Sequence, residues 1–348
     1  MTGSIVGPLP LCVIGGGSIG LRHAQQAMVS EAVSLTAVVE PGPDRRAELQ
    51  AMGLPAVGTL EDAPSTTRAA VVATPTPDHL ASGVAVIQRG WAALVEKPIT
   101  QTIEDGTRLC EVAEAHGIPL VTGHHRRCHP FVSEARALQG RIGDLAGING
   151  MWSLRKHDTY YDVLWRRTRG SGPILTNLSH EIDLLRFFAG ETVEVSAMTA
   201  NARRGLEIED TAAITFRFAS GALGTFMISD AGASPWAFEA ESGENPAIAF
   251  SGQDAMRIVG TTGAFGFPSL ELWQGGEGAE IDWRNPLKST PGPDLPVVDP
   301  IREQLARFAH VAKGGEDPLL ATGRDGLATL AVTEAVLRSA ESGRVEKV

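Results

Sequence analysis

Residues 9–20 read Leu-Pro-Leu-Cys-Val-Ile-Gly-Gly-Gly-Ser-Ile-Gly, an apolar run that ends in a glycine-rich turn and opens a helical pattern. The turn fits the pattern G-x-G-x-x-G. Its first glycine permits a tight bend, its second lets the backbone approach a pyrophosphate, and its third lets the helix pack against the strand. The free amides at the start of the helix suit phosphate oxygens. The stretch therefore predicts a dinucleotide-binding β–α unit whose cofactor-binding residues are Gly15, Gly17, Ser18, Ile19 and Gly20.

Short apolar runs alternate with helical patterns throughout residues 1–125. Further strands are expected at 35–39, 56–57, 69–73, 92–95 and 119–122, with helices at 44–52, 78–89 and 100–116. Strands that are apolar throughout and alternate with helices form parallel sheets covered on both faces. We therefore predict a doubly wound α/β Rossmann domain over residues 1–125.

The pattern changes in residues 126–348, where strands become longer and alternate apolar with polar positions. Expected strands lie at 145–154, 193–199, 211–218 and 222–229. In the third of these, Ile214, Phe216 and Phe218 share one face. Such alternation predicts a mostly antiparallel open sheet. With two helices near 301–312 and 326–342, it indicates an α+β domain for substrate binding and oligomerisation, whose C-terminal helices could pack back on the first domain.

The composition excludes several classes of partner. A formal net charge of −11 argues against nucleic acid or an anionic membrane as the main partner. The sequence has no apolar stretch long enough to span a bilayer, and its start lacks the pattern of a secretory signal. The three cysteines, Cys12, Cys110 and Cys128, form no CxxC pair and are expected to be free thiols. These features favour a cytoplasmic location.

Glu40 ends the second predicted strand, twenty residues after the last glycine of the turn. A carboxylate at this place accepts hydrogen bonds from the adenosine ribose hydroxyls, which favours NAD over NADP. Arg45 and Arg46 lie nearby and leave some room for the 2′-phosphate of NADP. The alternative is that Glu40 is a solvated strand end.

A proline-containing loop follows the fourth predicted strand and reads Thr74-Pro75-Thr76-Pro77-Asp78-His79. Prolines just beyond the carboxyl end of a strand fix a rigid loop where ligands bind in open α/β sheets. We expect Thr74, Pro75 and His79 to lie at the cofactor. Asp78 could equally cap a helix, and for His79 a purely structural role or a surface position is the alternative.

Glu96-Lys97-Pro98, after the next strand, completes a pattern that resembles the glucose–fructose oxidoreductase/inositol dehydrogenase (Gfo/Idh/MocA) family. The resemblance also covers the glycine-rich entry Gly170-Ser171-Gly172-Pro173, the helix start His180-Glu181-Ile182-Asp183, the segment 258–263 and the C-terminus. It implies hydride transfer between nicotinamide and a hydroxyl-bearing carbon of a sugar, sugar acid or cyclitol. It further implies that Lys97 is a substrate-binding and catalytic residue and that His180 is a general acid/base.

The residue types suit this chemistry. Removing a hydride from an alcohol requires that the hydroxyl proton be taken in step, and histidine serves as a base at neutral pH. A lysine at the same oxygen stabilises developing alkoxide charge. Because Lys97 and His180 fall in different predicted domains, this mechanism needs a cleft between them. The alternatives are a surface lysine and a helix histidine with structural partners.

One position departs from the family pattern. Many members carry an aspartate four residues before the helix histidine, whereas this chain has Thr176, followed by Asn177. We hypothesise that Thr176 or Asn177 binds substrate while His180 keeps the role of base. Asp183 either orients the imidazole or pairs with Arg186, and the sequence does not distinguish these.

Two further segments carry candidate site residues. His124-His125-Arg126-Arg127 follows the last Rossmann strand, so we expect His124 at the cofactor and Arg127 at the substrate. A salt bridge of Arg126 or Arg127 across the domain junction is the alternative, and the spacing does not favour a metal. In the polar and aromatic stretch from Lys156, we expect His157 and Asp158 to bind substrate. Glu96 and Lys97 are expected at the cofactor as well, which completes the predicted set around NAD and a polyhydroxylated substrate.

Two other functions remain open. One is an imine or double-bond reductase on the same fold, which the missing aspartate permits. The other is a non-catalytic NAD-binding sensor, although the pair of Lys97 and His180 argues against it. Because the second sheet has an apolar face and few helices to cover it, we also expect a homodimer or homotetramer assembled through that sheet.

Overall fold

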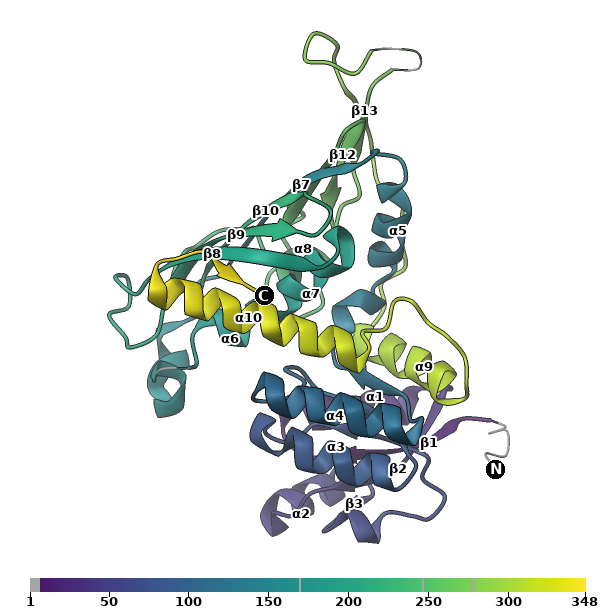
Figure 1. Cartoon of the computed structure of the whole chain (residues 1–348). Coiled ribbons are helices and arrows are strands. Elements are labelled where there is room, and N and C mark those ends of the chain that lie inside the picture. Colours follow the sequence, from purple (N-terminus) through teal and green to yellow (C-terminus); the bar gives the residue numbers. More distant parts are fainter. Residues whose placement is uncertain (1–6, 169, 246, 277, 279) are drawn as a thin grey trace. The chain divides into compact units, whose positions relative to one another are not determined.

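The computed structural model describes residues 7–168, 170–245, 247–276, 278 and 280–348, and they form two compact units. Residues up to His129 and the segment from Val298 to Leu330 make the first unit. Residues from Pro130 to Val297 and from Ala331 to the C-terminus make the second. Each unit has its own sheet (Figure 1).

The first unit is built on a six-stranded parallel sheet with strand order β3-β2-β1-β4-β5-β6. Its strands are β1 (Leu9–Ile14), β2 (Val33–Val39), β3 (Ala56–Val57), β4 (Ala69–Val72), β5 (Ala92–Val95) and β6 (Leu120–Thr122). The order reverses between β1 and β4, which is the place where open α/β sheets bind ligands at the carboxyl ends of their strands. The predicted Rossmann fold is confirmed.

Helices cover both faces of this sheet (Figure 1). One face packs against α1 (Ser18–Val29) and α9 (Pro300–Ala312), and the other against α3 (His79–Gln88) and α4 (Ile103–His116). Side chains of β1 alternate between the two cores, with Leu11 and Val13 in the first and Cys12 and Ile14 in the second. This two-sided burial explains why the strands are apolar throughout. The remaining helical elements are α2 (Pro43–Ala51), η1 (Leu60–Asp62), η2 (Thr76–Asp78) and η3 (His125–Cys128).

The second unit contains a nine-stranded sheet with order β14-β13-β12-β11-β7-β10-β9-β8-β15. Its strands are β7 (Leu145–Ser153), β8 (Thr192–Ala200), β9 (Thr211–Phe218), β10 (Leu223–Ser229), β11 (Met256–Gly260), β12 (Gly263–Phe267), β13 (Leu272–Gln274), β14 (Lys288–Thr290) and β15 (Glu346–Lys347). The pair of β7 and β10 is parallel, and the other pairs in the described strands are antiparallel. Ile214, Phe216 and Phe218 of β9 are all buried in one core, as the alternation predicts. The mostly antiparallel second sheet is confirmed.

Helices line the buried side of this second sheet. They are α5 (Pro130–Gln139), α6 (Pro173–Thr176), α7 (Leu178–Ala189) and α8 (Phe238–Ser242), with short turns η4 (Asp158–Asp162) and η5 (Leu164–Arg167). Helix α10 (Gly323–Ser342) runs from the first unit into the second. Ile182 and Leu185 of α7 join the apolar core of the sheet. The sequence analysis did not predict α5, α8 or the short strands β11 to β15.

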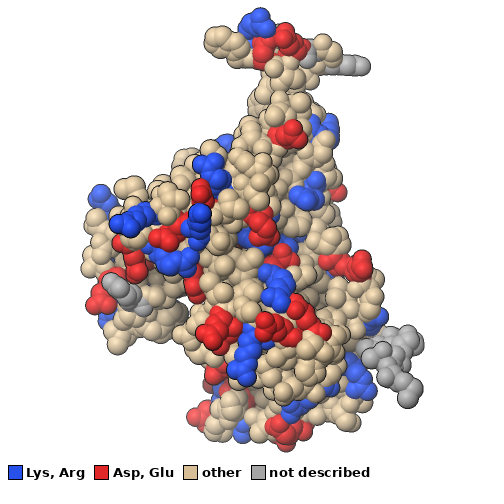
Figure 2. Space-filling view, viewed as in Figure 1, with Lys and Arg blue, Asp and Glu red and all other residues tan. Residues whose placement is uncertain are grey.

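The surface carries both signs of charge. On the face shown in Figure 2, acidic and basic side chains are interspersed. In the described part of the chain, no helix is both long and apolar enough to cross a membrane.

Candidate active site

The glycine-rich turn between β1 and α1 has the geometry that its sequence predicts. Gly15 adopts a φ of 101°, which disfavours any residue with a side chain. A side-chain carbon on Gly20 would overlap the carbonyl oxygen of Gly15, so this glycine allows the helix to pack closely on the turn. At Gly17, by contrast, the position of a side-chain carbon is open space. The turn thus leaves room beside Gly17 for a group that approaches the backbone.

The start of α1 suits a phosphate. Helix α1 begins at Ser18, and its N-cap residue Gly17 provides no side chain to accept the first helical amides. These amides and the positive end of the helix dipole favour a bound anion. Across the turn, the hydroxyl of Thr74 is buried without a hydrogen-bond partner among the described residues. The observed residues fit a dinucleotide pyrophosphate.

Glu40 joins the glycine turn to the loop after β2. Its two carboxylate oxygens accept hydrogen bonds from the backbone amides of Gly16, at 2.9 Å, and Gly42, at 2.8 Å. Arg45 donates to the carbonyl of Gly16, and Arg46 donates to the carbonyl of Glu40 itself. Glu40 is therefore fixed in place rather than a solvated strand end, and each oxygen retains a lone pair for a ribose hydroxyl.

His79, at the start of α3, is buried and holds two loops together. Its Nδ1 lies 2.9 Å from the carbonyl oxygen of Pro98, and its Nε2 lies 2.9 Å from that of Thr74. A neutral imidazole has one N–H, so it donates to one of these carbonyls at a time. The surface-histidine alternative is wrong, and the structural one describes what this side chain does. Through it, the Thr74-Pro75 loop is tied to the loop that follows Lys97.

Lys97 follows β5, and its backbone is held by the neighbouring carboxylate. Glu96 Oε1 lies 2.7 Å from His23 Nε2, and Glu96 Oε2 accepts a hydrogen bond of 3.1 Å from the Lys97 amide. A side-chain carbon on Gly123 would approach the Glu96 carboxyl at 2.9 Å, so β6 closes over it. Burial raises the pKa of Glu96, but the bond to His23 and the charges of His23, His125 and Lys97 outweigh it and lower the pKa to about 2.

His23 contacts the candidate site through Glu96, and sequence analysis missed it. It lies on α1, three residues after the last glycine of the turn, and is buried. A histidine on the apolar face of a helix gives no local signal of its partner, because Glu96 is 73 residues away in sequence. Only the fold brings the two together.

The segment after β6 is buried rather than exposed. His124, Arg126 and Arg127 have little exposed surface, and Arg127 Nη2 lies 3.6 Å from Asp325 Oδ1. This is an ion pair of the kind considered as the alternative for Arg127, but both partners belong to the first unit. Within the described residues, no group of three histidine, cysteine or acidic side chains could hold a metal ion.

In the second unit, His180 is buried in the first turn of α7. Asn177 is the N-cap residue, and its Oδ1 accepts hydrogen bonds from Thr176 Oγ1 at 2.8 Å and from Lys156 Nζ at 3.0 Å. With its oxygen facing Lys156 and Thr176, the planar amide directs its nitrogen away from both. The Thr176 hydroxyl also lies 3.1 Å from the carbonyl oxygen of Gly172, and with one proton it donates to one of these two oxygens at a time. Arg186 forms a two-pronged ion pair with Glu191.

His157 and Asp158 lie at the start of η4. His157 Nδ1 lies 2.6 Å from Thr159 Oγ1. Asp158 is largely exposed, and its Oδ1 pairs with Arg155 at 3.2 Å and with Arg204 at 3.3 Å. Both side chains have local partners, and their predicted contact with substrate stays a prediction.

Two family models match this chain. Residues 10–124 match the oxidoreductase family with an NAD-binding Rossmann fold, and residues 134–266 match a GFO/IDH/MocA C-terminal domain. The chain belongs to the Gfo/Idh/MocA family. The resemblance inferred from the sequence is confirmed, and with it an NAD(P)-binding Rossmann domain in an oxidoreductase.

Other proteins resemble this Gfo/Idh/MocA oxidoreductase over most of its length. It is 29% identical to a 1,5-anhydro-D-fructose reductase of Ensifer adhaerens over 80% of this chain and 79% of that one. It is 27% identical to a D-apiose dehydrogenase of Paraburkholderia graminis over 78% of this chain and 71% of that one. A crystal structure of an Agrobacterium radiobacter oxidoreductase with NAD+, L-tartaric acid and magnesium has the same fold, with a TM-score of 0.78 at 19% identity over 97% of this chain and 98% of that one.

Proposed function

We propose that this Gfo/Idh/MocA oxidoreductase transfers a hydride between NAD and a hydroxyl-bearing carbon of a sugar, sugar acid or cyclitol. His180 is the general acid/base, and Lys97 polarises the reacting oxygen. The observation that carries the proposal is the fixed backbone of Lys97, held at the carboxyl end of β5 by the His23–Glu96 pair. The names of the two relatives, a reductase and a dehydrogenase of sugars, support the same substrate class.

The cofactor half of the proposal rests on the first unit. A bound nicotinamide supplies the hydride acceptor. The turn from Gly15 to Gly20 and the amides at the start of α1 bind the pyrophosphate. Glu40, already oriented by Gly16 and Gly42, accepts from the adenosine ribose, which favours NAD over NADP. The Thr74 hydroxyl is available to donate to the cofactor.

The proposed chemistry uses His180 to transfer the proton and Lys97 to stabilise the developing charge. During oxidation of an alcohol, the His180 imidazole takes the hydroxyl proton, and it returns the proton in the reverse reaction. The Lys97 ammonium hydrogen-bonds the same oxygen and stabilises its developing negative charge. Asn177, oriented by Lys156 and Thr176, presents its amide to a further oxygen of the substrate.

Initial rates of nicotinamide reduction test this function. Wild-type protein is assayed with NAD and NADP against a panel of sugars, sugar acids and inositols, beside His180→Ala. His116→Ala is the control, because His116 lies exposed on α4. We expect turnover with NAD that falls at least about 100-fold in His180→Ala and is unchanged in His116→Ala. Near-normal turnover in His180→Ala would refute the role of His180.

We also propose that the protein self-associates through the nine-stranded sheet. Met198 of β8 is 77% exposed and Leu223 of β10 is 52% exposed, although both lie within a sheet whose opposite side chains form a core. Both side chains project from the sheet face opposite the core, which is the face that a second copy of the chain would cover. Light scattering is expected to show a dimer or tetramer, and a monomer at micromolar concentration would contradict this.

A further inference from the structure

Three cations gather on two adjacent tyrosine rings in the second unit. The rings of Tyr160 and Tyr161 meet edge to face at 5.0 Å. Lys156 Nζ lies 4.9 Å from the centre of the Tyr160 ring, and the Arg166 guanidinium lies 4.3 Å from it. Arg204 lies 4.5 Å from the centre of the Tyr161 ring. Two positive side chains thus share the Tyr160 ring, although like charges repel each other.

These cations differ in how their charge is balanced. The buried Asp230 carboxylate pairs with Arg204 at 3.1 Å and with Lys156 at 3.6 Å. Arg166, by contrast, pairs with no carboxylate among the described residues. Its Nη1 donates to the Tyr160 carbonyl at 3.2 Å, and its buried Nε has no hydrogen-bond partner in the part of the chain that the structure describes. The Arg166 guanidinium therefore keeps N–H groups that no described residue accepts.

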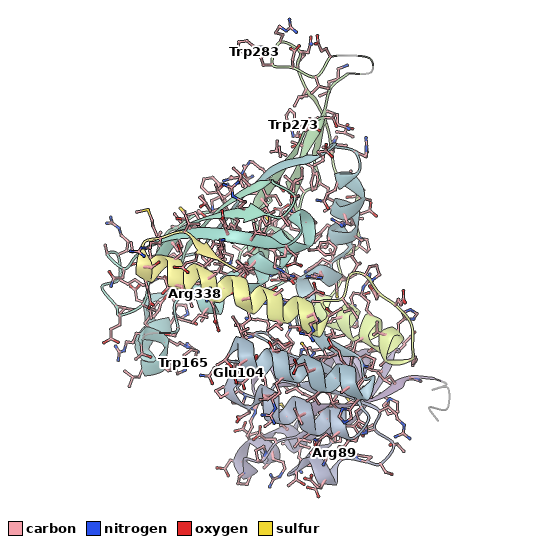
Figure 3. All side chains as sticks on the ribbon, in the orientation of Figure 1. Arg89, Glu104, Trp165, Trp273, Trp283 and Arg338 are labelled. Atoms are coloured by element: carbon pink, nitrogen blue, oxygen red, sulfur yellow. The ribbon has the colours of Figure 1, made fainter. Side chains whose placement is uncertain are left out.

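Arg166 lies in η5, beside the exposed Trp165 that Figure 3 labels. The segment from Arg155 to Thr168 contains four Lys or Arg side chains and two Asp, while the whole chain has a net charge of −11. A local excess of positive charge in an acidic protein attracts an anion to that segment. The Tyr160 ring limits the motion of Lys156 and Arg166, which reduces the entropy lost on binding.

Lys156 connects this cluster to the helix that carries His180. Its Nζ donates to Asn177, the N-cap of α7, and His180 lies in the first turn of that helix. A cation beside a helix N-terminus opposes the helix dipole, whereas an anion there is stabilised. Thr176 stands at the place of the family's aspartate, so that carboxylate is absent beside Asn177, while Glu181 is the acidic residue in the first turn of α7.

We propose that Lys156 and Arg166, held against Tyr160, bind an oxyanion on the substrate. The preferred substrate is then a sugar derivative with a carboxylate or phosphate group, and a neutral sugar binds less well. The inference rests on the proposed function, because it concerns the substrate of the same site. The planar Arg166 fork suits two oxygens of one anionic group, and Lys156 adds a point charge.

Matched substrates test the proposal. Initial rates with NAD are compared for D-glucuronate and D-glucose, for D-galacturonate and D-galactose, and for glucose 6-phosphate. We expect kcat/KM for at least one anionic compound to exceed that of its neutral counterpart by about 10-fold or more. Higher rates for uronates identify a carboxylate, and a higher rate for the phosphate identifies a phosphoryl group. Neutral sugars that are oxidised as well as or better than every anionic counterpart, glucose 6-phosphate included, would overturn the proposal.

Substitutions at Arg166 test whether this residue binds the anionic group of the substrate. Arg166→Gln is expected to raise KM for the anionic compound about 30-fold with a small change in kcat, and to leave the neutral sugar within about 3-fold. Arg166→Lys should restore part of the loss. Arg167→Gln removes an adjacent charge that is exposed and not placed on the ring, and serves as the control. Equal losses for anionic and neutral substrates in Arg166→Gln would contradict the assignment.

A binding measurement separates this inference from the proposed function. If no compound is oxidised, the proposed function fails, and calorimetric titration of the protein with glucuronate and glucose 6-phosphate in the presence of NAD still tests the anion site. Binding that weakens in Arg166→Gln and persists in Arg167→Gln supports the site. No binding of either anion by wild-type protein contradicts it.

Discussion

His23 Nε2 lies 2.7 Å from Glu96 Oε1, and this contact joins the helix that follows the glycine turn to the end of β5. Both side chains are buried, and the second Glu96 oxygen holds the amide of Lys97. A buried carboxylate is stable only with partners of this kind, because it has lost its hydration. The pair therefore couples the cofactor-binding turn to the position of the proposed catalytic lysine.

Replacing His23 should destabilise the protein. His23→Leu leaves the Glu96 carboxylate buried without its partner, and we expect the free energy of unfolding to fall by about 3 kcal/mol. His23→Gln, which keeps a donor, should lose less. Urea denaturation followed by circular dichroism measures both. A His23→Leu protein as stable as wild type would show that the contact contributes nothing.

The Glu96 carboxylate also predicts a pH dependence. Its pKa in the folded protein is about 2, below its ordinary value of 4.5, so the folded state stabilises the charged form. The resulting stability is fully present above about pH 5 and is lost as the pH falls toward 2. The difference in unfolding free energy between wild type and Glu96→Gln should therefore be larger at pH 6 than at pH 3. A difference that is independent of pH would contradict the lowered pKa.

Two glycines of the turn should respond differently to alanine. At Gly20 the added carbon would overlap the Gly15 carbonyl, so Gly20→Ala should lower stability by about 2 kcal/mol or more. At Gly17 it enters open space, so Gly17→Ala should keep the melting temperature and weaken NADH binding at least about 10-fold by displacing the pyrophosphate. Thermal melts and NADH fluorescence titrations compare them. Unchanged NADH affinity in Gly17→Ala would place the cofactor elsewhere.

Glu40 should set cofactor preference. Glu40→Ala removes an acceptor for the ribose and two backbone links, so we expect the Kd for NADH to rise about 10-fold, with a smaller rise for NADPH. Glu48→Ala is the control, since Glu48 pairs with Arg45 on the exposed side of α2. Equal weakening for both cofactors would mean that Glu40 acts only on the loop and not on the ribose.

The cysteines should be inert in the folded protein. Burial raises the pKa of Cys12 and Cys128 to about 12 and that of Cys110 to about 11. Since the thiolate is the reactive form, a disulfide reagent should modify them at least about 100-fold more slowly in the native protein than in urea. Three thiols per chain should react once the protein unfolds. Rapid modification of the native protein would contradict their burial.

The Rossmann unit could be predicted from sequence because its signals are local. The apolar strands, the turn from Gly15 to Gly20 and Glu40 follow each other within 32 residues, and the structure agrees in each element. The second unit was less predictable. Strands β12 to β14 have three to five residues each, too few for alternation to be recognised.

Contacts between distant residues explain what the sequence did not reveal. His23 was missed because its partner Glu96 lies far along the chain, and Lys156 was noticed only as part of a polar stretch, without its contact to Asn177. Glu40 was expected at the ribose alone, and its bonds to Gly16 and Gly42 add a role in the fold. Patterns along the chain predict elements, whereas such pairs depend on tertiary packing.

The most direct test of the proposed role of Lys97 in hydride transfer is the rate of NADH formation by Lys97→Ala beside wild type, with the best substrate of the panel. Lys288→Ala, a change on the exposed strand β14, is the control. We predict that Lys97→Ala lowers kcat/KM at least about 100-fold while NADH binding and the melting temperature persist, and that Lys288→Ala matches wild type. Wild-type turnover retained in Lys97→Ala would contradict it.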